Sequence, residues 1–241
     1  AKQCASTAEV ISVHTLVNDI FLKHGTEAQK QKYLTAAVEG KIGAFALTEA
    51  GAGSDAASAK TKAVVDGDDY VINGSKCFIS NMGPTEGDYV VVIALTDPEK
   101  GTKGMSAIVV DRGTPGFTVG KREEKLGIRG ADISELIFED CRVPRSNLIG
   151  QEGEGFKIAM AALDGGRIGM AAQGLGIADA AIEASIKYMK ERVQFGKPIA
   201  KLQGLQWYLA DMATRTEAAR ALVYEAACAA DSGEPLSKLA A

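Results

Sequence analysis

The spacing of hydrophobic residues changes twice along the chain, near Gly43 and near Gly153. Before the first change, residues 10–22 carry apolar side chains at helical spacing, and residues 26–40 begin with a Thr-x-x-Gln capping box, which predicts a second helix. Between the two changes, residues 43–149 contain short runs rich in β-branched and aromatic side chains. The middle of the chain is therefore predicted to be an all-β domain, either a small barrel or a sandwich.

Turn dipeptides separate the short runs of the middle segment. Asp66-Gly67 and Asn73-Gly74 both have the composition of tight hairpin turns. We therefore expect a β-hairpin at each of these two dipeptides.

Two long helices are predicted after the second change. Residues 156–190 and 202–230 return to helical spacing, with a Gly-Lys-Pro turn between them. A short link between long helices favours an antiparallel pair from a helical bundle. One face of the second helix is expected to carry Leu205, Leu209, Met212 and Leu222.

Charge and cysteine usage exclude several classes of function. The net charge is −4 and the pI is near 5.4, whereas nucleic-acid binding needs a basic face. No apolar run is long enough to span a bilayer. The four cysteines form no CxxC pair, which is typical of reduced thiols in a cytosol-like compartment. His14 and His24 belong to no metal-spaced cluster, so no metal site is predicted.

The segment Gly51–Ala56 fits the G-x-G-x-x-A pattern of dinucleotide-binding folds, but that pattern requires a helix next. The residues over 61–72 predict strand, turn and strand, so the Rossmann interpretation is rejected. A glycine-rich turn with Ser and Asp can still bind phosphate through free backbone N–H groups. On the residues alone, a tight loop that only connects strands is an equally good interpretation.

Three further motifs are ambiguous one at a time. Phe78 and Ser80, at a predicted strand end, could stack on and hydrogen-bond to a planar cofactor, although a core Phe is the commoner role. The two glycines before Arg167 lie in a predicted helix and indicate that either a ligand or a neighbouring helix approaches its backbone closely. Arg167 could bind a phosphate or an adenine in the first case and would be solvated in the second. Arg192, next to the Gly-Lys-Pro turn, could bind a diphosphate or be an ordinary helix-end residue.

In combination and in this order, the motifs resemble the acyl-CoA dehydrogenase family over nearly the whole chain, closest to the bacterial butyryl-CoA type. Further stretches that carry the resemblance are Gly25–Lys30, Lys125–Arg129, Phe138–Pro144 and Gly155–Met160. The resemblance implies an α+β multidomain fold. Residues 1–42 would end an N-terminal helical domain, residues 43–150 would form the central β-domain, and residues 151–241 would begin a C-terminal four-helix bundle. The chain would then be truncated at both ends, with another helix starting over residues 236–241.

The resemblance implies FAD between the β-domain and the helical bundle. Leu47 and Thr48 would meet the pyrimidine edge of the flavin, and Ser54 would lie near the diphosphate and the pantetheine. Phe78 would cover one flavin face, and the Ser80 hydroxyl would lie near N5. The full set of expected FAD contacts is Phe45, Leu47, Thr48, Gly53, Ser54, Phe78, Ile79, Ser80, Arg192, Phe195 and Gln203.

The resemblance also implies partners. Arg192 and Gln203 would reach the FAD of a neighbouring subunit, which implies at least a dimer and, as is usual in the family, a homotetramer built as a dimer of dimers. Ser54, Asp164 and Arg167 would bind the acyl-CoA substrate, with Arg167 at its nucleotide end. Electrons would pass to an electron-transferring flavoprotein, and no nucleic acid or membrane is expected.

The implied reaction is α,β-dehydrogenation of a short-chain acyl-CoA, of the butyryl-CoA to crotonyl-CoA type. A carboxylate removes the α-proton, the β-hydrogen leaves as hydride to flavin N5, and hydrogen bonds to the thioester oxygen stabilise the developing enolate. In most of the family the base is the Glu of a Tyr-Glu-Gly motif, which this chain does not contain. A minority place the Glu where this chain has Gly166. No catalytic residue is therefore assigned, and the usual Glu is expected beyond Ala241.

Two alternatives stay open at this point. A relative with another acyl group, such as glutaryl-CoA, would need a basic residue aimed at a distal carboxylate, and the sequence does not identify one. A non-catalytic flavin- or CoA-binding remnant is favoured by the missing Glu motif, but losing parts of two helical domains would expose large apolar faces.

Three positions depart from the common family pattern. Phe78 stands where many relatives have Trp, Ala50 replaces a common Pro, and Ser80 replaces a common Thr. Stacking by an aromatic ring and hydrogen bonding by a hydroxyl are both retained. The expected location is the cytoplasm of a bacterium, or the mitochondrial matrix if the source is eukaryotic.

Overall fold

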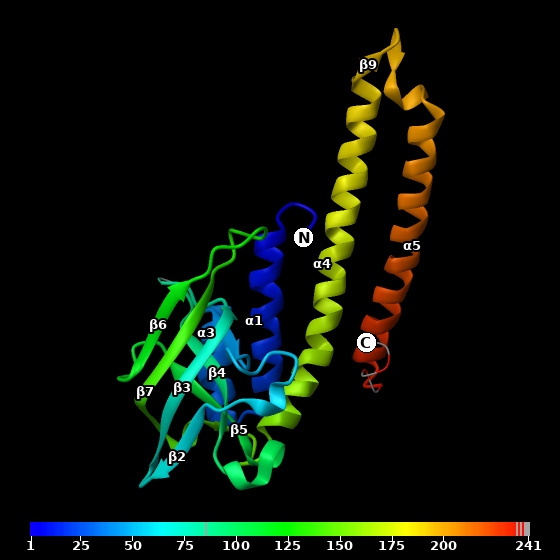
Figure 1. The fold of residues 1–241 in the computed structure, drawn as a ribbon. Coiled ribbons are helices and arrows are strands. Elements are labelled where there is room, and N and C mark those ends of the chain that lie inside the picture. Colours follow the sequence, from blue (N-terminus) through cyan, green and yellow to red (C-terminus); the bar gives the residue numbers. More distant parts are fainter. Residues whose placement is uncertain (85, 235, 237, 239–241) are drawn as a thin grey trace. The chain divides into compact units, whose positions relative to one another are not determined.

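The structure is a computed structural model of the chain, and it describes residues 1–84, 86–234, 236 and 238. N-terminal helices, a sheet and two long helices follow one another along the chain, as the change in hydrophobic spacing predicts (Figure 1). The helix start expected over residues 236–241 lies largely outside the described residues.

The chain forms two compact units. Val10–Leu163 form the sheet unit, and Ala1–Glu9 together with Asp164–Ala241 form the helical unit. The domain boundaries expected after residues 42 and 150 remain a prediction.

The N-terminal helices confirm the predicted capping box. The backbone N–H of Gln29 donates to Thr26 Oγ1 at 3.2 Å, and the backbone N–H of Thr26 donates to Gln29 Oε1 at 3.0 Å. These two bonds satisfy N–H groups that a helix start would otherwise leave without an acceptor. The helical elements are α1 (Ala5–His24), α2 (Glu27–Gln29), a π-helical turn (Lys30–Leu34) and α3 (Thr35–Val38).

The strands of the sheet unit join in one eight-stranded sheet within the described residues, in the order β6-β7-β3-β2-β4-β5-β8 with β1 pairing β4. Most neighbours are antiparallel, whereas β1 and β2 run parallel to β4. The strands are β1 (Gly43–Ala46), β2 (Lys62–Asp66), β3 (Asp69–Ser80), β4 (Tyr89–Leu95), β5 (Met105–Asp111), β6 (Phe117–Arg122), β7 (Ile133–Pro144) and β8 (Leu148–Ile149). Short 3₁₀ turns connect some of them at Ala56–Ser58, Pro98–Gly104 and Arg145–Asn147.

One of the two expected hairpins is present. Asp66 pairs with Asp69, so β2 and β3 are joined by a two-residue turn that begins at Gly67. Gly67 has φ +63°, the left-handed conformation that this kind of turn requires. The hairpin predicted from Asp66-Gly67 is therefore confirmed.

The hairpin expected at Asn73-Gly74 is wrong, because β3 continues through both residues and the register with β7 shifts there. Gly74 has φ +145°, and a Cβ atom at this position would lie 2.6 Å from Thr61 Oγ1 and 2.8 Å from its Cα. Glycine is needed here for close approach of two backbones within the sheet, not for a turn.

The sheet unit has two hydrophobic clusters, one on each side of β4. Alternate residues of β4 point to opposite faces, and both faces are buried, which explains its uninterrupted apolar run. One cluster lies between β4 and the N-terminal helices, where Phe21, Tyr33 and Tyr89 form ring contacts with centroids 4.6–5.9 Å apart. The other cluster brings Val92 of β4 together with Leu136 of β7, so the sheet folds over on itself, as a barrel or sandwich requires.

The helical unit contains α4 (Gly155–Glu191) from residue 164 onwards and α5 (Gln203–Asp231), with β9 (Val193–Gln194) and β10 (Lys197–Pro198) between them. A 3₁₀ turn, Ile199–Lys201, leads into α5. The two helices form an antiparallel pair, as predicted (Figure 1).

The contacts of α5 correct one detail of its expected apolar face. Arg220 Nη2 of α5 donates to Asp179 Oδ1 of α4 at 2.7 Å, and the buried residues of α5 are Thr216, Ala226 and Ala229. Leu222, expected on the same face as Leu205, is 67% exposed. The two positions are 17 residues apart, which at about 100° per residue turns them about 100° away from each other.

Candidate functional site

The first candidate segment follows the end of β1. Phe45 pairs with Val91 of the neighbouring β4 and is half-buried. Leu47, just after the strand, is buried, and Thr48 is half-buried. The chain then reverses, because Glu49 and Ala52 exchange two backbone hydrogen bonds of 3.1 and 3.0 Å. The sheet therefore holds the start of the segment, and a tight turn ends it.

The glycine-rich loop after this turn presents hydrogen-bond donors to open space. Gly53 and Ser54 are exposed, and their backbone N–H groups have no acceptor among the described residues. A Cβ atom added at Gly51 or Gly53 would meet no heavy atom within 4 Å. The glycines here are therefore not explained by packing, and free N–H groups in a turn are suited to binding phosphate oxygens.

The second candidate segment is the end of β3, where a β-bulge changes the direction of the side chains. Lys76 pairs with Leu136 and Ile79 pairs with Ser134, so Cys77 and Phe78 together face a single residue of β7. Phe78 has φ +58° and is 63% exposed, whereas Ile79 is buried. An exposed aromatic residue in a left-handed conformation is unusual, and such strain is more common at functional sites than elsewhere.

The two candidate segments are joined by hydrogen bonds. The backbone N–H of Cys77 donates to the Thr48 carbonyl oxygen at 2.9 Å. Lys76 Nζ donates to the Leu47 carbonyl oxygen at 3.0 Å and to Glu49 Oε1 at 2.8 Å. The structure thus brings the residues expected at the flavin edge, Leu47 and Thr48, next to the strand that carries Phe78.

Glu49 connects the ion pair to the far end of the glycine-rich loop. Its Oε2 accepts from the Lys60 backbone N–H at 2.7 Å, and its Oε1 accepts from that of Thr61 at 3.0 Å. Burial would raise the pKa of Glu49, but the bonds from Lys76, Thr61 and Lys60 outweigh it and lower the pKa. Burial lowers the pKa of Lys76, and the Glu49 carboxylate opposes this only in part.

Sequence reasoning missed the Lys76–Glu49 pair. The alternation of inward and outward residues along β3 could have indicated it. Tyr70 and Ile72 point inward, and residues two apart in a strand share a face. Lys76 lies on this inward face and is fully buried, as its position in the alternation indicates. A lysine on the core face of a strand predicts a buried acidic partner, although the sequence does not say which one.

The other expected site residues lie in the helical unit. Arg167 Nη1 donates to Asp164 Oδ1 at 2.6 Å on the same turn of α4. Arg192, just before β9, and Gln203, the first residue of α5, are both exposed. Phe195 lies at the tip of this hairpin, with φ +53° and 89% of its surface exposed. Together with Gly196 it forms the two-residue turn.

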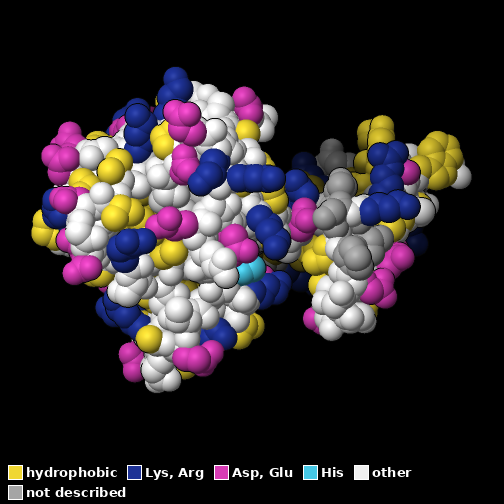
Figure 2. All heavy atoms as spheres, turned by 90° about the horizontal axis from the view of Figure 1, so that it is seen from below, with side chains coloured by type: hydrophobic (Ala, Val, Ile, Leu, Met, Phe, Trp, Pro, Cys, Tyr) yellow, Lys and Arg dark blue, Asp and Glu magenta, His cyan; other side chains and the backbone are white. Residues whose placement is uncertain are grey.

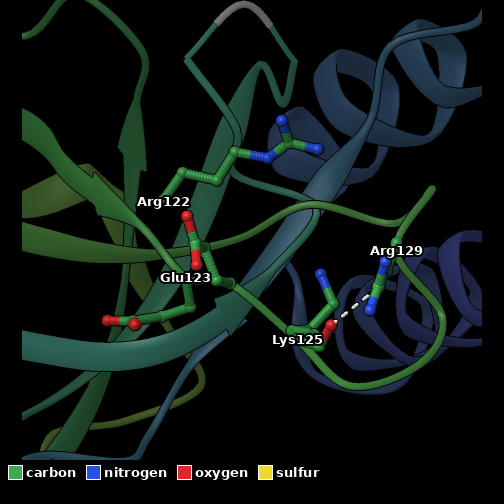
Figure 3. Close-up of a pocket in the computed structure, with 5 residues that line it drawn as sticks. Arg122, Glu123, Lys125 and Arg129 are labelled. Atoms are coloured by element: carbon green, nitrogen blue, oxygen red, sulfur yellow. Dashed lines mark hydrogen bonds between the residues drawn. The ribbon is translucent and has the colours of Figure 1, made fainter.

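A cavity of about 440 Å³ in the sheet unit contains none of the expected site residues (Figure 3). It lies at the end of β6, where Arg122 forms an ion pair with Asp132, and Arg129 Nε donates to the Lys125 carbonyl oxygen at 3.0 Å. Its lining combines both charges and consists of Arg122, Glu123, Glu124, Lys125 and Arg129.

On the face of the molecule drawn in Figure 2, the charged side chains do not gather into a patch of one sign. On the face shown in Figure 2, basic and acidic side chains are interspersed with hydrophobic ones. Among the described residues, no group of three or more His, Cys, Asp or Glu side chains is placed to hold a metal ion. In the same part of the chain, none of the helices combines the length and the apolarity needed to cross a bilayer.

Nearly the whole chain matches acyl-CoA dehydrogenase domains. Residues 1–41 match the N-terminal domain, residues 44–141 the middle domain and residues 153–241 the C-terminal domain. An acryloyl-CoA reductase (NADH) of Anaerotignum propionicum is 57% identical over 240 residues, which is 98% of this chain and 60% of the relative. A short-chain specific acyl-CoA dehydrogenase of Clostridium acetobutylicum is 53% identical over 98% of this chain and 62% of the relative.

Solved structures agree with the sequence comparison. Butyryl-CoA dehydrogenase of Megasphaera elsdenii is 49% identical and superposes with a TM-score of 0.96, over 99% of this chain and 63% of that protein. A chain from work on the electron-transferring flavoprotein of Acidaminococcus fermentans is 52% identical, with a TM-score of 0.95 over 98% of this chain and 62% of that chain. The chain thus spans about 60% of the length of the relatives it matches. Three consecutive domain matches and a shared fold show that the chain belongs to the acyl-CoA dehydrogenase family.

Proposed function

We propose that the protein catalyses FAD-dependent α,β-dehydrogenation of short-chain acyl-CoA thioesters, of the butyryl-CoA to crotonyl-CoA type, and passes the electrons to an electron-transferring flavoprotein. The observation that carries the proposal is the junction of segments 45–54 and 76–80, in which hydrogen bonds join the strand that carries the exposed Phe78 to the segment that leads into the free N–H groups of Gly53 and Ser54. The family and the short-chain relatives support the substrate class.

The residues of this junction fit FAD. A flat ring system is recognised by an aromatic face and by hydrogen-bonding groups at its edge, and its diphosphate by unpaired backbone N–H groups. Phe78 supplies the face, Thr48 and Ser80 supply hydroxyl groups, and Gly53 and Ser54 supply the N–H groups. When bound, FAD supplies the acceptor for the β-hydrogen of the substrate.

This chain's own residues bind and orient the reactants. The chain contains no Tyr-Glu-Gly motif, so none of its residues is assigned to proton abstraction. The backbone of segment 47–48 is fixed before any ligand binds, because three hydrogen bonds from β3 hold segment 47–49. Groups that are fixed in advance lose little freedom when they bind the edge of a cofactor, so less of the binding free energy is lost to ordering.

Residues of the helical unit extend the same proposal. We assign Asp164 and Arg167 to the CoA portion of the substrate, where the guanidinium would meet the nucleotide. Arg192, Phe195 and Gln203 are assigned to the FAD of a neighbouring subunit, within a homotetramer in the bacterial cytoplasm. Their exposure leaves them accessible to a second subunit, and the bacterial relatives named above support the location. The native mass of the purified protein tests the oligomer, since a monomer would contradict the shared site.

Reduction of a short enoyl-CoA is a second candidate function. The observation that favours it is the 57% identity with an acryloyl-CoA reductase. The two directions use the same binding residues, and the electron partner decides between them.

The experiment is a steady-state panel on the natural full-length protein. Butyryl-, octanoyl-, isovaleryl- and glutaryl-CoA are each assayed with an electron-transferring flavoprotein as acceptor, and acryloyl- and crotonyl-CoA are assayed with a reductant. We expect the highest kcat/KM for butyryl-CoA. A preference for glutaryl- or octanoyl-CoA would contradict the substrate class, and activity only in the reducing direction would establish the second candidate.

A further inference from the structure

We propose that Lys76 and Glu49 act as a positioning pair that sets where the Leu47–Thr48 backbone meets the edge of the flavin. The inference rests on the proposed function and names the residues that determine the geometry of its cofactor site. Neither side chain belongs to the set of expected flavin contacts. They act through the segments that they connect.

Stability does not account for the Lys76–Glu49 pair. The Lys76 side chain is fully buried and that of Glu49 is 10% exposed. Removing two charges from water is expensive, and apolar pairs of similar size often stabilise a fold as well or better. Some other property of the pair, such as the specific geometry that it imposes, therefore has to explain a charged pair at this position.

The hydrogen bonds of the pair hold the segment that is expected to meet the flavin edge. Lys76 binds both the Leu47 carbonyl and the Glu49 carboxylate, and the next residue, Cys77, binds the Thr48 carbonyl. All three residues of segment 47–49 are therefore held by two consecutive residues of β3. Phe78 follows Cys77 directly, in the bulge. A shift of Lys76 would therefore change the distance between Phe78, which is expected to cover the flavin face, and the Leu47–Thr48 backbone, which is expected to meet the flavin edge.

Glu49 also holds the glycine-rich loop. Glu49 also accepts the backbone N–H groups of Lys60 and Thr61, so one carboxylate joins both ends of segment 50–59, which carries the free donors of the loop. Within this loop, Ser58 Oγ donates to the Asp55 carbonyl at 2.8 Å and to the Gly51 carbonyl at 3.3 Å, and neither bond reaches segment 47–49. Without the Glu49 carboxylate, the Glu49–Ala52 backbone bonds would still hold the start of the loop, but its far end at Lys60 and Thr61 would lose the bonds that connect it to Glu49.

The test compares a double variant with a matched control in the natural full-length protein. Lys76→Met with Glu49→Gln removes both charges and keeps an oxygen acceptor for one backbone N–H. The control is Lys41→Met with Asp88→Asn in the same unit. That pair is also linked at 3.0 Å, and its carboxylate also accepts a backbone N–H, that of Ile42 at 2.8 Å. Three properties are measured: the urea unfolding midpoint of the apoprotein, the Kd for FAD from quenching of flavin fluorescence, and the visible spectrum of bound flavin.

The expected result separates positioning from stability. The control should keep the wild-type Kd and spectrum. The double variant should unfold near the wild-type midpoint, bind FAD at least about tenfold more weakly, and show a shifted flavin absorption band, because hydrogen bonds at the flavin edge change. If the double variant does not fold, Lys76→Gln with Glu49→Gln carries the test, because it leaves no unpaired charge and keeps hydrogen-bonding groups at both positions; it should change the Kd and the spectrum in the same direction by less.

The outcomes that overturn the inference differ from those that overturn the function. A wild-type Kd and spectrum in the folded variants would overturn the positioning role, while the wild-type protein would still bind FAD and be reduced by butyryl-CoA. If the wild-type protein cannot be loaded with flavin at all, the proposed function fails and the positioning role fails with it.

Discussion

The strained, exposed position of Phe78 leads to opposite predictions for stability and for cofactor binding. An L-residue in the left-handed region costs about 1–2 kcal/mol, and Phe78 has φ +58°. Glycine avoids this cost but loses roughly 0.5–1 kcal/mol more backbone entropy on folding. Replacement by Gly should therefore leave the apoprotein about 0.5–1 kcal/mol more stable than replacement by Ala, which keeps the strain.

The exposed fraction of Phe78 determines how much stability is lost when its ring is removed. Phe78 is 63% exposed, so its removal forfeits only about a third of the roughly 1.5–3 kcal/mol that full burial of a Phe side chain contributes. Phe78→Ala should then destabilise the apoprotein by about 0.5–1 kcal/mol, and Phe78→Gly should lie within about 0.5 kcal/mol of wild type. Loss of a stacked aromatic ring typically costs about 1–3 kcal/mol of binding, so both variants should bind FAD roughly 5- to 150-fold more weakly.

Urea unfolding of the apoprotein and titration with FAD measure the two quantities separately. Phe117→Ala is the control, because Phe117 stacks on Phe138 at 5.0 Å within the sheet unit and should affect stability without changing the Kd for FAD. A loss above about 2 kcal/mol in Phe78→Gly would show that the ring belongs to the core. An unchanged Kd for FAD in both variants would refute the stacking role.

Three further predictions test the fold that carries the site. Phe21→Ala should destabilise the sheet unit by about 3–5 kcal/mol, because Phe21 is fully buried against Tyr33 and Tyr89, whereas Leu22→Ala, at a position 60% exposed, should change the urea midpoint little. Gly74→Ala should destabilise the sheet unit by more than about 2 kcal/mol, because the added Cβ would lie 2.8 Å from the Thr61 backbone. Gly67→Ala should be destabilised less, because nothing lies within 4 Å of the added Cβ and only the positive φ is unfavourable. Burial lowers the pKa of His14, so the imidazole binds a proton more readily in the unfolded chain than in the folded one. The folded state is therefore favoured above the unfolded pKa of His14, and this contribution to stability falls as the pH drops towards the folded pKa. NMR titration should therefore give a His14 pKa below the ordinary histidine value. The unfolding free energy should also decline less between pH 7 and pH 5 in His14→Gln than in the wild type. An equal decline in both proteins would contradict the role of His14 in this pH dependence.

Local signals in the sequence predicted local structure well. The capping box at Thr26 and Gln29 and the turn after Asp66 depend on residues three or four apart, and both are present. The order of helices and strands follows from hydrophobic spacing, which also acts over short distances. The family resemblance rests on ordered motifs, and the domain matches confirm it.

Features that depend on distant contacts could not be predicted. The role of Gly74 depends on Thr61, which approaches it only after β2 and β3 have paired. The partner of Lys76 is 27 residues away in sequence, and the alternation of β3 gives the burial of the lysine but not the identity of the acid. Leu222 was placed on the wrong face because many exposed apolar residues in the helical unit blur the helical pattern.

The anaerobic visible spectrum of the purified natural protein, recorded before and after addition of butyryl-CoA, tests the central claim most directly. We expect the bands of bound oxidised FAD at first and their bleaching when butyryl-CoA is added, since electrons from the substrate then reside on the cofactor. Bound flavin that no short-chain acyl-CoA bleaches would contradict the proposed reaction. A folded protein that can neither retain nor regain flavin would contradict the cofactor site on which the account depends.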